Sequence, residues 1–284
     1  MGTLIDQTNF YDIRFTDSIG NVLPYEAEGV SSTVGNYWVK TSLTTTPTHI
    51  YCYYKNSTAQ TNGSNTTGTW NSGYLSVYHF GNGSTISTSD VTSNNNTLTN
   101  SYASATTGIT GGGALFSGAQ CMVSQNNIGI YGNAARTLEI WVKTTTWNTG
   151  DYNGLIASGE NSSNKLSSIC IDPSGNYYGG FYGNDLGGYN CTNGTWFHIV
   201  VTHDGTTAKI YSNGTLIGYQ GKTFNTSNNQ LNIGRRMSNG TYHTGSLDEA
   251  RMSNTARSAA WITFEYNNIN SADQELTWSA QQTP

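Results

Sequence analysis

A tyrosine- and glycine-rich segment holds the side chains best suited to bind an uncharged polar ligand. This segment, Gly175–Asn190, reads GNYYGGFYGNDLGGYN. Aromatic rings pack on the apolar faces of sugars, while asparagine and aspartate supply directional hydrogen bonds. We therefore predict a carbohydrate-binding surface, with two further aromatic residues coming from a preceding loop. The candidate residues are Tyr177, Tyr178, Tyr182, Tyr189, Trp147 and Tyr152.

The same tyrosines have a second interpretation, because alternate residues of a strand point to opposite faces. One of Tyr177 and Tyr178, together with Phe181, would then fill a hydrophobic core. The remaining tyrosines would lie on the surface or in a contact between subunits. Both interpretations fit the sequence.

The acidic residues do not form the pattern of a glycoside hydrolase. Such an enzyme needs two carboxylates that flank the substrate, and alternate residues of one strand provide this arrangement. The nearest approach is the adjacent pair Asp248-Glu249, whose side chains would point to opposite faces of a strand. We predict that this pair is structural and that the protein is not an enzyme. A polysaccharide-degrading enzyme with an unfamiliar site is the alternative.

Residues that commonly bind metals are scattered along the chain. The sequence has no His-x-x-x-His motif and no adjacent His-Glu pair. Aspartates in predicted turns offer the oxygen ligands that calcium prefers, but turn formation alone explains each of them. We therefore predict no cofactor and assign no metal ligand, with a structural Ca²⁺ ion left open as the alternative. The residues considered are His49, His79, His198, His203, His243, Asp151, Asp172, Asp185 and Asp204.

The elements that must position these residues are short strands. In the segment Gly194–Gly218, the apolar residues Phe197, Ile199 and Val201 alternate with other residues, as in a strand with one buried face. The pair Asn213-Gly214 is typical of a two-residue hairpin turn, in which both residues adopt positive φ. This segment therefore predicts a meander of antiparallel strands.

The composition is that of an all-β protein with few charges. Of 284 residues, 10% are charged and 12% are aromatic, and the net charge is −5. Aromatic and β-branched residues between frequent turn signals favour a sandwich or barrel. No basic stripe indicates nucleic-acid binding, and no long apolar run indicates a membrane helix. A short helix is indicated only at Ser258–Phe264.

Cysteine spacing gives little information. It fits no zinc-binding pattern. A disulfide between Cys170 and Cys191 is one interpretation, which requires an oxidising compartment. Reduced thiols that act as small apolar residues are the preferred one.

Several ordered blocks resemble the LamG-like (laminin G type 3) domains of the concanavalin A-like lectin/glucanase superfamily. Besides the hairpin segment, they are TLEIWVK at Thr137–Lys143, LNIGRR at Leu231–Arg236 and GSLDEARMSNTAR at Gly245–Arg257. The resemblance covers about residues 70–270 and implies a jelly-roll β-sandwich. That architecture hosts lectins, adhesins, hydrolases and structural proteins. The resemblance also implies that the Asp-Glu pair belongs to a structural closing block.

The N-terminal part resembles the DUF2341 family, a β-rich domain of unknown function, over about residues 10–56. The motifs are DIRFTD at Asp12–Asp17, YWVK at Tyr37–Lys40 and THIYCYYK at Thr48–Lys55. We therefore expect a small β-rich appendage at 1–60, a linker at 61–70, the sandwich at 71–270 and a tail at 271–284. We expect the appendage to dock onto virion or surface-assembly proteins, or to form a homo-oligomer.

These observations predict a non-enzymatic binding or adhesion module for a glycan, a host surface or a protein ligand. Residues 1–10 lack the cationic start and apolar core of a signal peptide. A surface-type module of this kind fits a virion component, such as a decoration, head-fibre or tail protein. An extracellular or cell-surface location is the alternative. A purely structural role in a virion or cell-surface complex is the second hypothesis, and we expect no nucleic acid or membrane partner.

Overall fold

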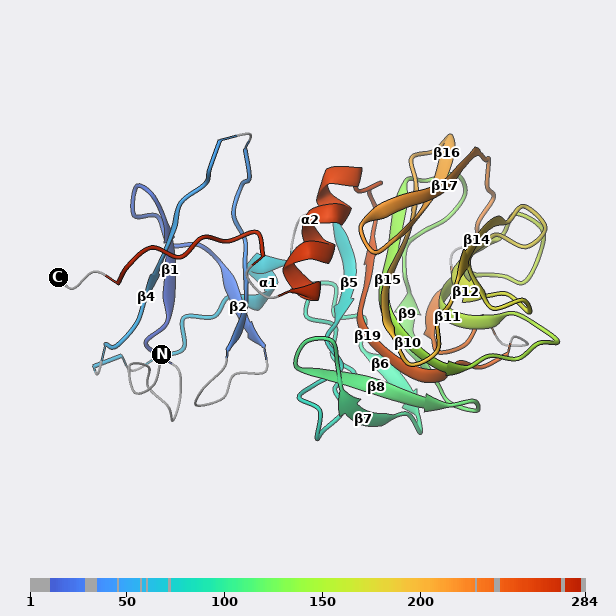
Figure 1. The fold of residues 1–284 in the computed structure, drawn as a ribbon, viewed down its shortest axis with the longest axis horizontal. Coiled ribbons are helices and arrows are strands. Elements are labelled where there is room, and N and C mark those ends of the chain that lie inside the picture. Colours follow the sequence, from blue (N-terminus) through green and yellow to red (C-terminus); the bar gives the residue numbers. More distant parts are fainter. Residues whose placement is uncertain are drawn as a thin grey trace.

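The chain forms a β-sandwich beside a smaller N-terminal group of strands (Figure 1). The computed structural model describes residues 11–28, 35–44, 46–56, 58–59, 61–70, 73–227, 229–237, 241–271 and 274–281. The first ten residues, on which the signal-peptide prediction rests, lie outside the described residues, as do parts of the expected appendage and tail. No helix in the described ranges is long and apolar enough to cross a membrane.

Fifteen of the described strands build the sandwich. They are β5 (Tyr74–Tyr78), β6 (Leu98–Ser101), β7 (Ser104–Thr107), β8 (Gly112–Ser117), β9 (Cys121–Asn127), β10 (Arg136–Thr146), β11 (Asn153–Gly159), β12 (Leu166–Ile171), β13 (Asn176–Gly180), β14 (Leu186–Asn190), β15 (Trp196–His203), β16 (Thr207–Ser212), β17 (Thr215–Gly221), β18 (Gln230–Ile233) and β19 (Thr244–Ser253).

These strands form two large antiparallel sheets. The eight-stranded sheet has the order β17-β16-β15-β10-β19-β8-β7, and β5 also pairs with β19. The seven-stranded sheet has the order β14-β13-β12-β11-β18-β9-β6. The arrangement confirms the predicted jelly-roll β-sandwich.

Apolar side chains from both sheets fill the space between them. Leu138, Ile140 and Val142 of β10 are fully buried and belong to the same core as Ile169 and Ile171 of β12. Complete burial of such a side chain stabilises a fold by about 1.5–3 kcal/mol. This alternation positions every other residue of the same strands on the outer faces.

The predicted hairpin segment is confirmed in detail. Phe197, Ile199 and Val201 of β15 face the core. Asn213 and Gly214 connect β16 to β17 with φ angles of 49° and 75°, as a two-residue hairpin turn requires. Local sequence therefore specifies this part of the eight-stranded sheet.

The N-terminal residues form two small antiparallel sheets. Strand β1 (Arg14–Asp17) pairs with β4 (Ile50–Tyr53), and β2 (Tyr25–Glu28) pairs with β3 (Asn36–Val39). Ile13, Phe15 and Tyr25 form their core. The residues expected as a linker, 61–70, contain helix α1 (Thr66–Thr69) and end at the buried Trp70.

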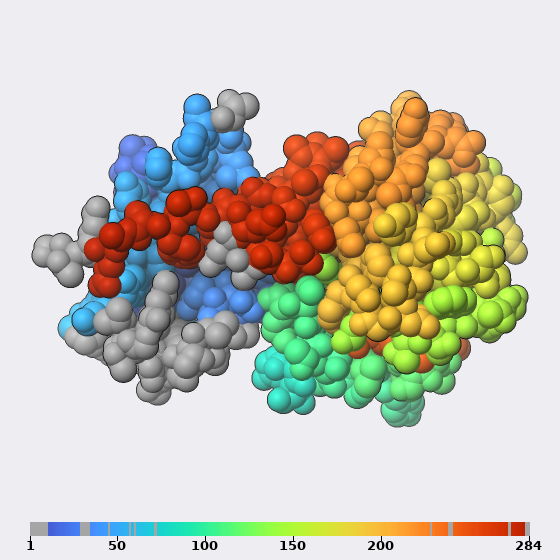
Figure 2. Space-filling view, in the orientation of Figure 1, coloured from blue at the N-terminus to red at the C-terminus, as the bar shows by residue number. Residues whose placement is uncertain are grey.

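The C-terminal helix is longer than the sequence indicates. Helix α2 spans Ala259–Asn270, and Ser258 Oγ accepts the Trp261 N–H at 3.2 Å as its N-cap. Ile262 packs on the sheet, and the ring of Tyr266 stacks on Trp141 at 5.7 Å. These contacts extend the helix beyond its local signal. The chain then runs back across the N-terminal strands (Figures 1 and 2).

A fully buried arginine lies on the outer face of the eight-stranded sheet. The Arg251 guanidinium donates to Glu249 Oε2 at 2.5 Å and to Glu265 Oε2 at 2.6 Å, and its Nη1 lies 3.4 Å from Glu139 Oε1. Burial disfavours the ionised form of Glu139, but Arg251 and His198 outweigh it and lower the pKa of this carboxyl. One cation thus joins β19, β10 and α2.

Two tryptophans attach the N-terminal strands to this cation. The Arg251 guanidinium carbon lies 4.5 Å from the ring centroid of Trp38 and 5.0 Å from that of Trp70. The two indoles also contact one another at 5.3 Å. Cation–π contacts of a desolvated arginine are worth about 2 kcal/mol, so Arg251 also stabilises the junction between the N-terminal strands and the sandwich.

We expect Arg251→Met to lower the free energy of unfolding by about 3–5 kcal/mol, because removal of one partner leaves buried carboxylates without their cation. Urea denaturation of the full chain measures this loss. Lys165→Met is the control, since Lys165 forms an exposed pair with Glu160 at 3.5 Å. Its effect should stay below about 1 kcal/mol, and equally small effects of both substitutions would contradict the role of Arg251.

A buried histidine makes the sandwich sensitive to acid. His243 is fully buried beside Phe116, and neither ring nitrogen has a hydrogen-bond partner among the described residues. Burial lowers the pKa of His243 from 6.5 to about 3. Because the unfolded chain binds this proton more readily, stability falls as the pH drops below about 6.5 and continues to fall towards the folded pKa.

Between pH 7 and pH 5, we expect the free energy of unfolding of the wild-type protein to fall by about 2 kcal/mol more than that of His243→Leu. The physical reason is that leucine has no proton to bind in either state. Urea denaturation at both pH values measures the difference. The exposed His49 provides a control, and His49→Gln should keep the wild-type pH dependence. An unchanged dependence in His243→Leu would contradict the assignment.

Candidate functional site

The aromatic residues predicted to bind carbohydrate lie in different environments. Tyr177 is fully buried in the core, with its ring centroid 5.3 Å from that of Phe197. Its ring therefore offers no face to a ligand, which corrects the prediction for this residue. Phe181 is also fully buried. The core interpretation thus applies to Tyr177 and Phe181, while Tyr178 points to the outer face.

Three other predicted residues come together on the outer face of the seven-stranded sheet. The ring centroids of Tyr152 and Tyr178 are 5.6 Å apart. The Arg236 guanidinium carbon lies 4.9 Å from the Tyr152 centroid and 5.3 Å from the Tyr182 centroid. We call these four residues, Tyr152, Tyr178, Tyr182 and Arg236, the tyrosine–arginine cluster.

The tyrosine–arginine cluster offers ring faces and hydroxyl groups, while the Arg236 cation in contact with them is buried, with an exposed fraction of 9%. Tyr182 is 41% exposed. Burial, with Asp185 and Tyr152 nearby, raises the pKa of Tyr178 to about 12, and burial also raises the pKa of Tyr152. Both hydroxyls therefore stay protonated near neutral pH and can donate and accept hydrogen bonds. Ring faces beside hydroxyl groups are the kind of surface that suits a polyhydroxylated ligand.

The last two predicted residues lie apart from the cluster. Tyr189 is 45% exposed and lines a hollow of about 390 Å³ together with Gly188, Asn190, Thr192 and Phe197. Trp147 is partly buried and packs against the hydrophobic core. The six candidates thus divide among the core, the cluster and a neighbouring hollow.

Arg236 is the cluster residue that sequence reasoning missed. It follows β18, whereas the tyrosines belong to other segments. Only the pairing of β18 with β11 brings it to the same face of the sheet as Tyr152. In the sequence it is half of an isolated Arg-Arg pair, which carries no binding signal of its own.

Two of the turn aspartates considered for calcium binding accept hydrogen bonds from the backbone of their own turns. Asp172 Oδ1 accepts the N–H groups of Ser174 and Asn176. Asp204 Oδ1 accepts from the Thr206 hydroxyl and from backbone N–H groups, and these hydrogen bonds lower its pKa to about 2. Within the described residues, none of the four aspartates joins a group of three potential metal ligands.

The Asp248-Glu249 pair lies at a bulge where β19 changes partners. Residues before it pair with β8, and residues after it pair with β5. Glu249 has a φ of 48°, and Asp248 Oδ2 accepts the N–H groups of Ile109 and Thr110. Both carboxyl groups are fully buried. Their contacts give this pair a structural role.

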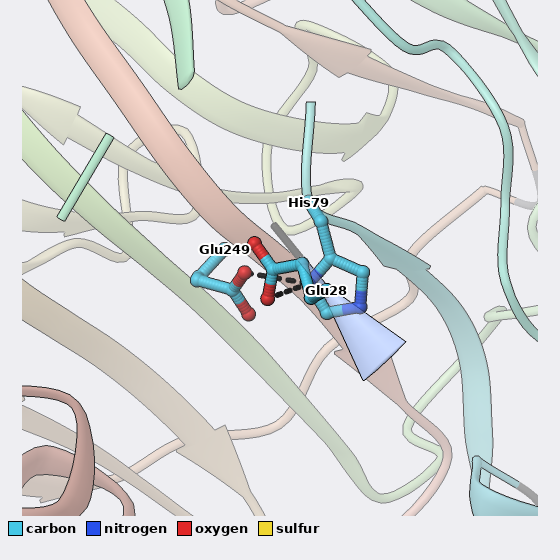
Figure 3. Close-up of side chains that lie close together, drawn as sticks. All are labelled: Glu28, His79 and Glu249. Atoms are coloured by element: carbon cyan, nitrogen blue, oxygen red, sulfur yellow. Dashed lines mark hydrogen bonds and ion pairs between the residues drawn. The ribbon is translucent and has the colours of Figure 1, made fainter. Parts of the chain in front are cut away.

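The structure also brings together a histidine and carboxylates that lie far apart in the sequence. Glu28, His79 and Glu249 each offer one ligand atom, and these atoms lie within 4.8 Å of one another (Figure 3). All three residues are buried. Potential metal ligands are therefore scattered along the sequence, as predicted, but these three lie together in the folded structure. No local signal could have found the group, since its members come from β2, the end of β5 and β19.

Solved structures with the same fold have low sequence identity to the chain. Domain 4 of AbnA, an extracellular arabinanase of Geobacillus stearothermophilus, has a TM-score of 0.54 and 20% identity, covering 67% of this chain and 97% of that domain. The binding domain of Paraclostridial Mosquitocidal Protein 1 has a TM-score of 0.55 and 15% identity, covering 69% of this chain and 52% of the toxin domain. A Trypanosoma rangeli sialidase has a TM-score of 0.54 and 13% identity, covering 70% and 34%. The chain thus spans about half of the toxin domain and a third of the sialidase.

Family matches agree with the fold. Residues 9–97 match DUF2341, a domain of unknown function, and residues 116–263 match the laminin G type 3 family. No curated protein matches the chain. The laminin G match covers more than half of the chain and runs from within β8 into α2, whereas the DUF2341 match extends beyond the expected residues 10–56 and includes β5 of the sandwich. The chain therefore belongs to the concanavalin A-like lectin/glucanases superfamily.

Proposed function

We propose that this protein is a non-enzymatic binding module that takes a glycan on the tyrosine–arginine cluster. The observation that carries the proposal is the convergence of three tyrosines and one arginine on a single outer face of the sandwich. Tyrosine combines an apolar face with a hydroxyl, so it suits ligands that alternate apolar faces and hydroxyl groups. The arabinanase domain of the same fold is described in complex with arabinotriose, which supports a sugar ligand for this architecture.

Hydrogen bonds from Lys222 hold the loop beside the cluster in place. The ammonium group of Lys222 donates to Asn184 Oδ1 at 2.7 Å and to the Asp185 carbonyl at 3.2 Å. These contacts hold the loop that follows Tyr182, so the exposed tyrosine is carried by an ordered segment. An ordered aromatic group loses little conformational entropy when a ligand binds.

For the setting we propose the outside of a virion, as a decoration, head-fibre or tail protein, with a cell-surface or extracellular position as the alternative. The low content of charged residues supports contact with uncharged glycans of the kind that cover cell surfaces. Capsid and tail genes beside the coding sequence would support the virion setting. A neighbouring secretion system or cell-wall anchor would favour the alternative.

A second candidate role is assembly through the N-terminal strands. Strand β4 turns Tyr51 and Tyr53 to solvent, with exposed fractions of 49% and 55%, while its alternate residues are half-buried. Ile19 and Val22 are exposed as well, at 83% and 68%. Large exposed apolar groups on one small unit favour a contact with another protein or with a second copy.

We expect Tyr182→Ala and Tyr178→Ala to weaken glycan binding at least about tenfold, equivalent to about 1.4 kcal/mol, because each removes a ring face from the cluster. An array that includes arabino-oligosaccharides measures this. Tyr102→Ala is the matched control, since Tyr102 is 92% exposed and follows β6 at the opposite edge of the same sheet. Failure of the wild-type protein to bind any glycan would refute the proposal, as would equal binding by all three variants.

For the assembly role, we expect a Tyr51→Ser and Tyr53→Ser double variant to lose self-association or particle incorporation while remaining folded. The physical reason is the loss of apolar contact area at an exposed surface. Sedimentation velocity measures self-association, and copurification with particles measures incorporation. A double variant that still assembles like the wild-type protein would rule out this surface.

A further inference from the structure

The junction between the N-terminal strands and the sandwich holds a buried histidine among carboxylates. His79 Nδ1 lies 2.5 Å from Glu249 Oε1 and 3.4 Å from Glu28 Oε2 (Figure 3). His79, Glu28 and Glu249 have exposed fractions of 6%, 6% and 0%. This group packs on the eight-stranded sheet, so it is separate from the tyrosine–arginine cluster on the other sheet.

A third carboxylate orients the imidazole. His79 Nε2 lies 3.3 Å from Glu26 Oε2, so the Nε2 proton can be donated to Glu26. Nδ1 faces the two other carboxylates and holds a proton towards Glu249 Oε1 at 2.5 Å, so a bound metal ion would take the place of that proton. A histidine whose second nitrogen donates to a carboxylate is the usual arrangement behind a metal-binding imidazole.

The two facing carboxylates are also held in place. Trp38 Nε1 donates to Glu28 Oε2 at 2.7 Å, and Arg251 Nη2 donates to Glu249 Oε2 at 2.5 Å. Glu28 Oε1 is buried and has no hydrogen-bond partner among the described residues. Buried carboxylates require a compensating cation. Arg251 supplies one for Glu249, whereas the ion pairs of the described residues give Glu28 only His79.

The cluster has a route to solvent. A crevice of about 340 Å³ reaches it, lined by Glu26, Glu28 and His79 on one side and by the segment 81–91 on the other. An ion could enter there without unfolding the junction. The crevice also leaves room for a water ligand.

We propose that His79 Nδ1, Glu28 and Glu249 bind one divalent transition-metal cation of the Zn²⁺ type, which ties the N-terminal strands to the sandwich. Imidazole nitrogen with carboxylate oxygen is a ligand set that Zn²⁺ accepts. Neighbouring ligands of a tetrahedral zinc ion lie about 3.4 Å apart, which is the distance between His79 Nδ1 and Glu28 Oε2. The shorter contact to Glu249 opens when the ion replaces the proton on Nδ1. This inference goes beyond the proposed function.

The test uses the full chain after removal of metal with a chelator. Zn²⁺ is titrated by calorimetry, Co²⁺ by visible absorption, and bound metal is counted by mass spectrometry after dialysis. We expect one ion per chain with micromolar or tighter affinity, a Co²⁺ spectrum of low coordination number, and a melting temperature higher by several degrees with Zn²⁺. Less than a tenth of an equivalent, with no Co²⁺ spectrum, would overturn the proposal.

Glu28→Gln isolates the ligand role, because glutamine keeps the size and an acceptor for Trp38 but loses the charge. We expect its Zn²⁺ affinity to fall at least tenfold, whereas Glu160→Gln, an exposed control, should match the wild-type protein. Unchanged affinity in Glu28→Gln would also overturn the site. If this variant does not fold, the wild-type Co²⁺ spectrum and the shift of the His79 nitrogen signals on Zn²⁺ binding decide the question. Glycan binding is measured on the metal-free protein, so the outcome of the metal test does not decide the proposed function.

Discussion

The requirement that buried charges be paired organises the junction on which the rest of the molecule depends. Arg251 is almost completely buried, and its guanidinium contacts carboxylates from β19, β10 and α2 while two indoles cover it. An unpaired charge in such a place is strongly destabilising. The position of α2 on the sheet and the attachment of the N-terminal strands therefore share the contacts of one side chain.

The same requirement explains the contacts of the acidic pair of the closing block. At the bulge, Asp248 accepts backbone N–H groups of the segment before β8, while Glu249 pairs with His79 and Arg251. Side-chain hydrogen bonds thereby stabilise the backbone at the point where β19 changes its partner strand. Carboxylates used in this way stabilise the bulge, and the proposed binding surface lies on the other sheet.

The separation of these two regions suits a binding module. The N-terminal strands and α2 cover the outer face of the eight-stranded sheet (Figure 1). The tyrosine–arginine cluster lies on the outer face of the other sheet. Ligands of such folds are held by a few well-placed groups on a rigid scaffold. Strands of the sandwich position these residues: Tyr152 directly precedes β11, Tyr178 is the central residue of β13, and Arg236 lies three residues after β18.

The sequence alone determined the strands, their turns and the family, because period-two alternation in β15 and the Asn213-Gly214 turn are local signals. It also placed Tyr152, Tyr178 and Tyr182 among the candidate ligand contacts. Only the tertiary structure decided that Tyr177 faces inwards, that α2 continues to Asn270, and that Arg236 joins the tyrosines. It alone assembled Glu28, His79 and Glu249. These contacts join segments far apart in the chain, and no local pattern records which strands will become neighbours.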